Sequence, residues 1–329
     1  MRDNPISCTL DFDGQGRRHG HLKLPYSHDG SAWGSIMIPI TVIAGGGGPT
    51  VLITGANHGE EYEGPIALMD LALNLDPGAV NGRVIMVPMM NYPAFRAALR
   101  TSPIDGGNMN RVFPGRPDGT VTEKIADYFQ RTLLPMADIV LDIHAGGKTL
   151  DFVPFAAAHV LDDKAQQGRC VAAMEAFNAP YHTMLLELDS VGMYDRAAED
   201  QGKVFVTTEL GGGGSATVTT TNVAKKGINN LLRHAGILAG DPEITPSQKL
   251  DMPDVDCFIT CDQSGLLEMC VDLGQSVRKG DVIGRVHNVE HTGRAPAEFG
   301  AAMDGILAGR HYPGLIEMGD MLAMIAVPV

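Results

Sequence analysis

A histidine and a glutamate lie three residues apart in the polar segment 55–65, where His58 is followed by Glu61. An imidazole nitrogen and a carboxylate oxygen at this spacing can bind one metal ion, and Zn²⁺ accepts this combination of ligands. Catalytic zinc sites usually combine three protein ligands with one open position. Because four-residue patterns recur by chance, a polar loop without metal or an acidic helix cap is the alternative until a third ligand is found.

Two further candidates end other predicted strands. His144 follows the apolar segment 138–143, and Glu209 follows the apolar segment 204–208. Because parallel strands bring their carboxyl ends to one edge of a sheet, both side chains should lie near the His58 loop. We predict His144 as the third ligand and Glu209 as the base that takes a proton from water. A satisfied core histidine and a solvated acid are the alternatives.

The segment 100–115 carries candidates for binding a substrate. Arginine binds carboxylates through two parallel hydrogen bonds, and a neighbouring asparagine adds donors. Arg111 with Asn110 is therefore a candidate clamp for the carboxylate of an amino acid. Arg100 could polarise the scissile carbonyl and stabilise the oxyanion. On spacing alone, either arginine could instead be an exposed surface cation.

Strands and helices alternate in the part of the chain that carries these candidates. The predicted strands are 50–54, 83–88, 138–143, 183–188 and 204–208, and the predicted helices are 65–73, 122–134, 162–177 and 222–239. This alternation predicts an α/β fold with a mostly parallel sheet flanked by helices on both faces. Earlier residues predict a hairpin followed by one more strand.

A proline-punctuated linker at 241–254 precedes a change of pattern. Beyond it, short apolar segments alternate with glycine turns, which predicts a smaller all-β domain of the barrel-sandwich type. We place the catalytic domain at 1–245 and the β domain at 246–329. A carrier domain of this type holds its cofactor on a lysine at a hairpin tip, and the tip segment 288–297 has none. We therefore expect a structural or dimerising role.

Composition excludes several classes of partner. A formal charge of -14 argues against nucleic acid and anionic membranes. The sequence has neither the roughly 20 apolar residues of a membrane span nor the apolar core of a signal peptide at its start. Its five cysteines follow no pattern, which favours free thiols in a reducing cytoplasm. A homodimer would be ordinary for a chain of this size.

Together these segments resemble the succinylglutamate desuccinylase/aspartoacylase family of zinc deacylases, which is related in fold to the zinc carboxypeptidases. The segments that carry the resemblance are His58 with Glu61, Asn110–Gly115, Asp142–His144 and Thr208–Glu209. The resemblance covers nearly the whole chain, because members also have a carboxyl-terminal β domain. It implies one Zn²⁺ per chain, bound by His58, Glu61 and His144.

The resemblance also implies a reaction, the hydrolysis of the amide bond of a small N-acyl amino acid. Asn110 and Arg111 would bind the substrate carboxylate, and Glu209 would be the base. Arg100 matches the carbonyl-polarising arginine of the family only loosely, because the loop 102–108 is longer than usual. A zinc carboxypeptidase that cleaves small peptides shares the ligands and is the alternative, and a binding protein that had lost a ligand is a third interpretation.

Within the family, the chain as a whole is similar to the N-acetyl-diaminobutyrate deacetylases of ectoine breakdown. A desuccinylase or aspartoacylase acting on another N-acyl amino acid is the alternative. A substrate with a side-chain ammonium would need an acidic or aromatic partner. Glu187, Asp189 and Asp195 are near Glu209 in sequence, and nothing in the sequence distinguishes among them.

Overall fold

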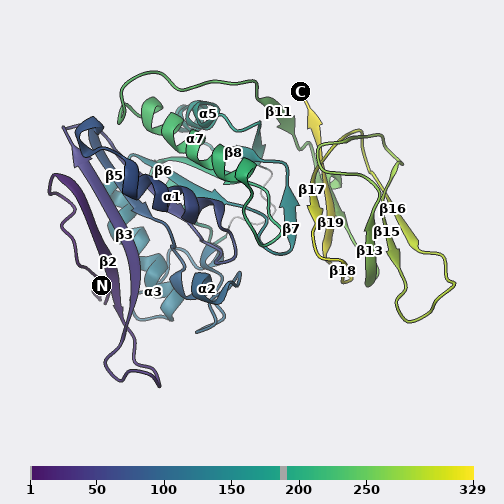
Figure 1. Cartoon of the computed structure of the whole chain (residues 1–329), viewed down its shortest axis with the longest axis horizontal. Coiled ribbons are helices and arrows are strands. Elements are labelled where there is room, and N and C mark those ends of the chain that lie inside the picture. The colour runs from purple at the N-terminus through teal and green to yellow at the C-terminus, as the bar shows by residue number, and fades with distance from the viewer. Residues whose placement is uncertain (1, 186–190) are drawn as a thin grey trace.

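The computed structural model describes residues 2–185 and 191–329, and a long mixed β-sheet runs through it (Figure 1). Its strands up to residue 209 are β1 (Ser7–Cys8), β2 (Gly16–Pro25), β3 (Ser35–Gly45), β4 (Thr50–Gly55), β5 (Gly82–Val87), β6 (Ile139–His144), β7 (Leu150–Phe152), β8 (Phe155–His159), β9 (Tyr181–Leu185) and β10 (Val204–Glu209). The later ones are β11 (Gln248–Asp251), β12 (Phe258–Thr260), β14 (Ser276–Val277), β17 (Gly305–His311) and β19 (Met321–Pro328). The main path runs β1-β2-β3-β5-β4-β6-β10-β8-β9-β11-β19-β17-β14, while β7 and β12 pair at its side.

The centre of this sheet is parallel, as the alternating pattern predicts. Strands β5, β4, β6 and β10 pair in parallel, whereas β3 joins β5 and β8 joins β10 in the antiparallel sense. The parallel register of β6 and β10 sets Glu209 directly opposite His144. Two of the predicted site residues therefore end neighbouring strands at one edge of the sheet.

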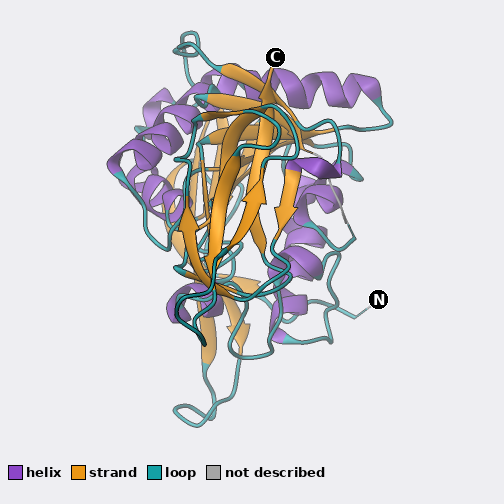
Figure 2. Ribbon diagram, turned by 90° about the vertical axis from the view of Figure 1, so that its right-hand side faces the viewer, coloured by secondary structure: helices purple, strands orange, loops and turns teal. Residues whose placement is uncertain are grey.

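Helices cover both faces of the sheet (Figure 2). On one face lie α1 (Glu63–Asn74), α5 (Lys164–Phe177) and α7 (Val218–His234), and on the other lie α3 (Val121–Tyr128) and α6 (Tyr194–Glu199). Successive residues of a strand point to opposite faces. In β4, Val51 and Ile53 accordingly pack in the hydrophobic core under α1, α5 and α7. Leu52 packs in the core on the other face, under α3 and α6. Burial on both sides explains the uninterrupted apolar sequence of these strands.

Two predicted helices have different limits in the structure. Helix α7 begins four residues earlier than predicted, because the Thr217 hydroxyl accepts a hydrogen bond from the Thr220 amide and caps it. It ends at His234, just before Gly236, whose φ of 74° is left-handed. The helix predicted at 122–134 is interrupted, since α3 is followed by a π-helical turn (Phe129–Leu133) and by the short α4 (Leu134–Met136).

The predicted linker is partly a strand. Within residues 241–254, β11 pairs in parallel with β9 and antiparallel with β19, so it continues the main sheet into the carboxyl-terminal strands. Phe155 and Leu250 share a buried cluster with Met324, which unites side chains from both sides of the linker. Residues 241–254 are therefore not only the linker that the sequence predicts, because they also join the two regions through backbone pairing.

The carboxyl-terminal region also contains a separate antiparallel sheet of four strands, in the order β16-β15-β13-β18. Its strands are β13 (Gly265–Met269), β15 (Val282–His287), β16 (Ala297–Gly300) and β18 (Leu315–Ile316). Ile283 of this sheet packs with Leu307 and Ile325 of the long sheet. No helix in the described part of the chain is long and apolar enough to cross a membrane.

Candidate metal centre and active site

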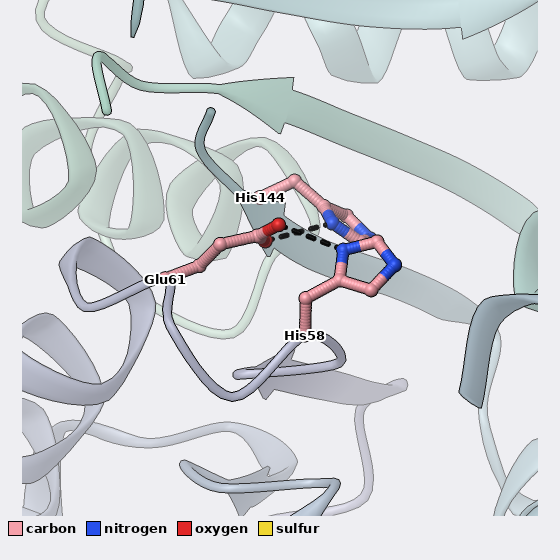
Figure 3. A group of neighbouring side chains, drawn as sticks. All are labelled: His58, Glu61 and His144. Carbon is pink, nitrogen blue, oxygen red and sulfur yellow. Dashed lines mark hydrogen bonds and ion pairs between the residues drawn. The ribbon is translucent and has the colours of Figure 1, made fainter. Parts of the chain in front are cut away.

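His58, Glu61 and His144 form a buried group at the carboxyl edge of the central strands (Figure 3). His58 and Glu61 lie in the loop between β4 and α1, and His144 is the last residue of β6. Both rings face the Glu61 carboxylate from the same side (Figure 3), with Oε1 2.7 Å from His58 Nδ1 and Oε2 2.9 Å from His144 Nδ1. One ligand atom of each residue lies within 4.8 Å of the others, so the group could hold a metal ion.

Glycines let this loop pack tightly against its neighbours. A Cβ at Gly59 would lie 2.1 Å from the backbone of Ala94, and a Cβ at Gly64 would lie 3.0 Å from the Ile143 side chain. The first distance is too short for any side chain, and the second would require the neighbouring atoms to shift slightly. Glycine at position 59 therefore brings the His58–Glu61 loop close to Ala94, and glycine at position 64 brings the start of α1 close to the end of β6.

Asp142 orients the ring of His144. Its Oδ2 lies 2.8 Å from His144 Nε2 and also accepts from Asn57 Nδ2 (2.9 Å), while its Oδ1 accepts from Thr54 Oγ1 (2.6 Å). An acceptor at Nε2 keeps a hydrogen on that atom, so the Nδ1 lone pair faces the Glu61 carboxylate. Two acceptors this close require a proton or a metal cation between them.

The pKa shifts in the group have the same origin. Burial alone would lower the pKa of His144, but the carboxylates of Asp142 and Glu61 raise it well above its ordinary value. Burial alone would raise the pKa of Glu61, but the two histidines hold it below its ordinary range. Burial lowers the pKa of His58, which favours the neutral ring that a metal ion requires.

The donor set fits a divalent cation. Two imidazoles and one carboxylate converge, and His58 Nε2 is buried without a hydrogen-bond partner among the described residues. Zn²⁺ is commonly bound in catalytic sites by three protein ligands of these types. The residues present therefore suit the metal that the sequence predicts.

Glu209 lies beside this group and holds a proton readily. Burial, and then the charge of Glu61, raise the pKa of Glu209 to about 8. Its Oε2 is buried and has no hydrogen-bond partner in the described part of the chain. A carboxylate with a raised pKa and an open oxygen is suited to accept a proton from a reacting molecule.

A cavity of about 340 Å³ opens next to the group. Among the residues predicted from the sequence, those that line it are His58, Arg100, Asn110, Arg111, His144 and Glu209. Arg100 Nη1 lies 3.9 Å from Glu61 Oε1, which places this exposed arginine at the site. Arg111 Nη1 donates to the Asn110 carbonyl (2.6 Å), and Asn110 Oδ1 accepts from the Tyr194 amide (2.9 Å).

Other residues that line the cavity were not predicted from the sequence. Phe258, Met321 and Met324 form part of the wall, although they lie in the carboxyl-terminal region for which a structural or dimerising role is expected. Their contact with the cavity depends on the pairing of β19 with β11, which no local pattern signals. Asp195, a candidate partner for an ammonium group, also lines the cavity. The other two candidates, Glu187 and Asp189, lie outside the described residues.

Residues 47–235 match the family described as the succinylglutamate desuccinylase/aspartoacylase catalytic domain. The chain belongs to this family, and it is therefore an enzyme of the hydrolase class. Among its relatives is the N-alpha-acetyl-L-2,4-diaminobutyric acid deacetylase of Halomonas elongata, 54% identical over 99% of this chain and 96% of the relative.

Solved structures are similar over the whole length. The product-bound structure of the ectoine utilization protein EutE (DoeB) from Ruegeria pomeroyi is 61% identical, with a TM-score of 0.97, covering 99% of this chain and 100% of that one. A succinylglutamate desuccinylase from Silicibacter sp. TM1040 is also 61% identical, with a TM-score of 0.98 and full coverage of both chains. These likenesses include the carboxyl-terminal strands as well as the sheet with the candidate metal group.

Proposed function

We propose that this protein hydrolyses N-α-acetyl-L-2,4-diaminobutyrate to L-2,4-diaminobutyrate and acetate, as a zinc-dependent cytoplasmic enzyme of ectoine degradation. The observation that carries the proposal is the full-length similarity, at 54% identity, to a relative with that deacetylase name. The buried His58, Glu61 and His144 group beside a small cavity supports it independently.

One zinc ion per chain is part of the proposal, with His58, Glu61 and His144 as its ligands. A zinc ion bound there acts as a Lewis acid that polarises a carbonyl group and makes water more acidic. Asp142 holds the His144 ring in the tautomer that binds metal, through the contact at Nε2.

Glu209 is the proposed base and acid. Its open Oε2 takes a proton from the water that attacks the acetyl carbonyl, and it later returns the proton to the departing α-amine. The raised pKa supports both steps, because a carboxyl group of this kind exchanges a proton near neutral pH.

The two arginines and Asn110 position the substrate in this proposal. Arg111 and Asn110 bind the α-carboxylate, since both line the cavity and their side chains are held by hydrogen bonds. Arg100 faces the reacting carbonyl and stabilises the negative oxygen that develops there, which its position near Glu61 supports.

The carboxyl-terminal region would restrict the cavity to small substrates. A volume of about 340 Å³ is near the lower end of the roughly 300–1,000 Å³ found for ligand pockets. We infer a catalytic domain at 1–245 and a barrel-sandwich domain at 246–329, supported by the core that Ile283 shares with Leu307 and Ile325. A homodimer completes the proposal, as two-fold assemblies are the commonest among soluble oligomers.

The test is a paired measurement on purified protein, of metal content and of amine release from a panel of substrates. The panel contains N-acetyl-2,4-diaminobutyrate, N-acetylaspartate, N-succinylglutamate and dipeptides. About one zinc per chain, with release from the diaminobutyrate derivative alone, is expected. Activity on dipeptides alone would replace the deacetylase with a zinc carboxypeptidase, and protein without metal or turnover would overturn the site.

A further inference from the structure

The cavity extends along the face of β10, away from the candidate metal group. Glu209, Thr207 and Phe205 alternate along this strand and all line the cavity. At roughly 3.3 Å per residue, Glu209 and Phe205 are about 13 Å apart along the strand. The cavity thus has two ends, one at Glu209 and one near Phe205.

Asp195 provides an acidic group near the Phe205 end of this cavity. It is 7% exposed, lies in the first turn of α6 and lines the cavity. The preceding residue, Tyr194, donates its amide hydrogen to Asn110 Oδ1 at 2.9 Å. Asp195 is therefore next in sequence to a residue that contacts the proposed carboxylate clamp.

Two buried groups stand behind Asp195. His159 Nε2 lies 3.7 Å from Asp195 Oδ2, and His159 Nδ1 lies 2.8 Å from Glu199 Oε1. The His159 ring also stacks on Phe205, with 6.3 Å between centroids. Two carboxyl groups, those of Asp195 and Glu199, therefore lie beside one buried imidazole ring near the Phe205 end of the cavity. A carboxyl group in a cavity wall can form a charge-assisted hydrogen bond with an ammonium group of a ligand.

The other charged groups of the cavity wall already have proposed roles. Among its described lining residues, the carboxylates are Asp142, Asp195 and Glu209. Asp142 holds the ring of His144, and Glu209 faces the metal group. Among the described residues of the wall, Asp195 is therefore the carboxyl group that remains for a cationic side chain.

We propose that Asp195 binds the side-chain ammonium of the substrate and so selects an N-acyl diamino acid over a neutral one. This inference rests on the proposed function and adds a third group of the substrate that the enzyme recognises. The α-carboxylate lies at Arg111 and Asn110, the acetyl group lies at Glu209, and the ammonium lies at Asp195. His159 and Glu199 are positioning residues that hold the carboxylate of Asp195 in place.

The test compares two substrates of nearly equal shape, N-acetyl-L-2,4-diaminobutyrate and N-acetyl-L-norvaline, in which a methyl group replaces the ammonium. The zinc-loaded enzyme and its Asp195→Asn variant are assayed on both. We expect the preference for the cationic substrate, as a ratio of kcat/KM values, to fall about 10- to 100-fold in the variant. The loss should appear mainly in KM, because the ammonium is remote from the bond that breaks.

Asp200→Asn is the matched control, since Asp200 ends the same helix, pairs with Arg196 and is 57% exposed. It should keep the preference. An equal loss on both substrates in Asp195→Asn would show a structural role and overturn the inference. An intact preference would also overturn it, and would assign the ammonium to another acid such as Glu187 or Asp189.

Failure of the proposed function has a different signature, because the unaltered enzyme would then release no acetate from N-acetyl-L-2,4-diaminobutyrate. A crystal structure of the unaltered protein with L-2,4-diaminobutyrate provides a measurement that does not depend on how the variant folds. We expect the side-chain nitrogen within about 3.2 Å of an Asp195 oxygen. A nitrogen bound elsewhere would contradict the inference.

Discussion

Two buried histidines lie between pairs of carboxylates on strands that flank β10, and their surroundings differ. His144 on β6 contacts Asp142 and Glu61 at 2.8 and 2.9 Å. His159 on β8 lies 2.8 Å from Glu199 but 3.7 Å from Asp195. Because β6 runs parallel to β10 and β8 runs antiparallel to it, the first histidine lies beside Glu209 and the second beside Phe205.

The decisive difference is a second imidazole. His58 contacts the carboxylate of Glu61 next to His144, so the first cluster offers three converging donors to a metal ion. Among the described residues, the group that could hold a metal ion consists of His58, Glu61 and His144, and His159 is not part of it. In the two proposals, the same carboxylate–imidazole–carboxylate pattern serves a metal ion at one end of a cavity and an organic cation at the other.

The largest expected difference between the clusters is in metal content. His144→Gln should lose bound zinc and more than about 10³-fold of turnover, because the Lewis acid contributes several kcal/mol. His159→Gln, the matched change in the other cluster, should retain about one zinc per chain. Elemental analysis of both proteins measures this, and a zinc-free His159→Gln or a zinc-loaded His144→Gln would contradict the comparison.

Glu209→Gln distinguishes proton transfer from metal binding at the Glu209 end of the cavity. The amide cannot accept the proton of the attacking water, so kcat should fall about 10²- to 10⁴-fold. Zinc content should stay as in the unaltered enzyme, because Glu209 is not among the proposed ligands. Steady-state kinetics with parallel metal analysis tests this, and near-normal turnover would remove Glu209 from its role.

Asp142 and Asp195, one carboxylate from each cluster, should differ in their effect on metal affinity. Asp142→Asn should weaken zinc binding about 10- to 100-fold, as for other residues that hold a ligand ring. Asp195→Asn should leave zinc affinity as it is. Competition with a chromogenic chelator measures both affinities, and equal values for the two variants would show that Asp142 does not support the metal group.

Arg111→Ala is expected to have the smallest effect, because this arginine is exposed. KM should rise about tenfold for substrates with a free α-carboxylate. The corresponding carboxamides should bind equally to both proteins. Arg116→Ala, an exposed arginine paired with Glu123, is the control. A matching rise in KM for the carboxamides would rule out the carboxylate clamp.

The first cluster was predictable from the sequence, and the second was not. Apolar segments before His58, His144 and Glu209 predict parallel strands, and parallel strands bring their ends together. Strand β8 has the sequence Phe-Ala-Ala-Ala-His, without the β-branched residues that typify strands, so His159 could not be placed. Asp195 was a candidate, but only the packing of α6 distinguishes it from its neighbours in sequence.

The contribution of the carboxyl-terminal strands to the cavity wall also could not be predicted from local sequence patterns. A linker was predicted from its prolines, and the pairing of β11 with β9 and β19 depends on residues far apart in the chain. Hydrophobic periodicity reports which face of a strand is buried, and it does not report which distant strand covers that face. The barrel-sandwich domain and the roles of the site residues stay predictions.

The pairing of β19 with β11 also has a consequence for biosynthesis. Ribosomes produce the chain from its amino end, so all the candidate metal ligands exist before Met321 and Met324 are made. Until β19 docks, the cavity lacks part of its wall and the nascent sheet exposes apolar side chains, a hazard for aggregation. Assembly of a competent cavity is therefore a late event in the life of each newly made molecule.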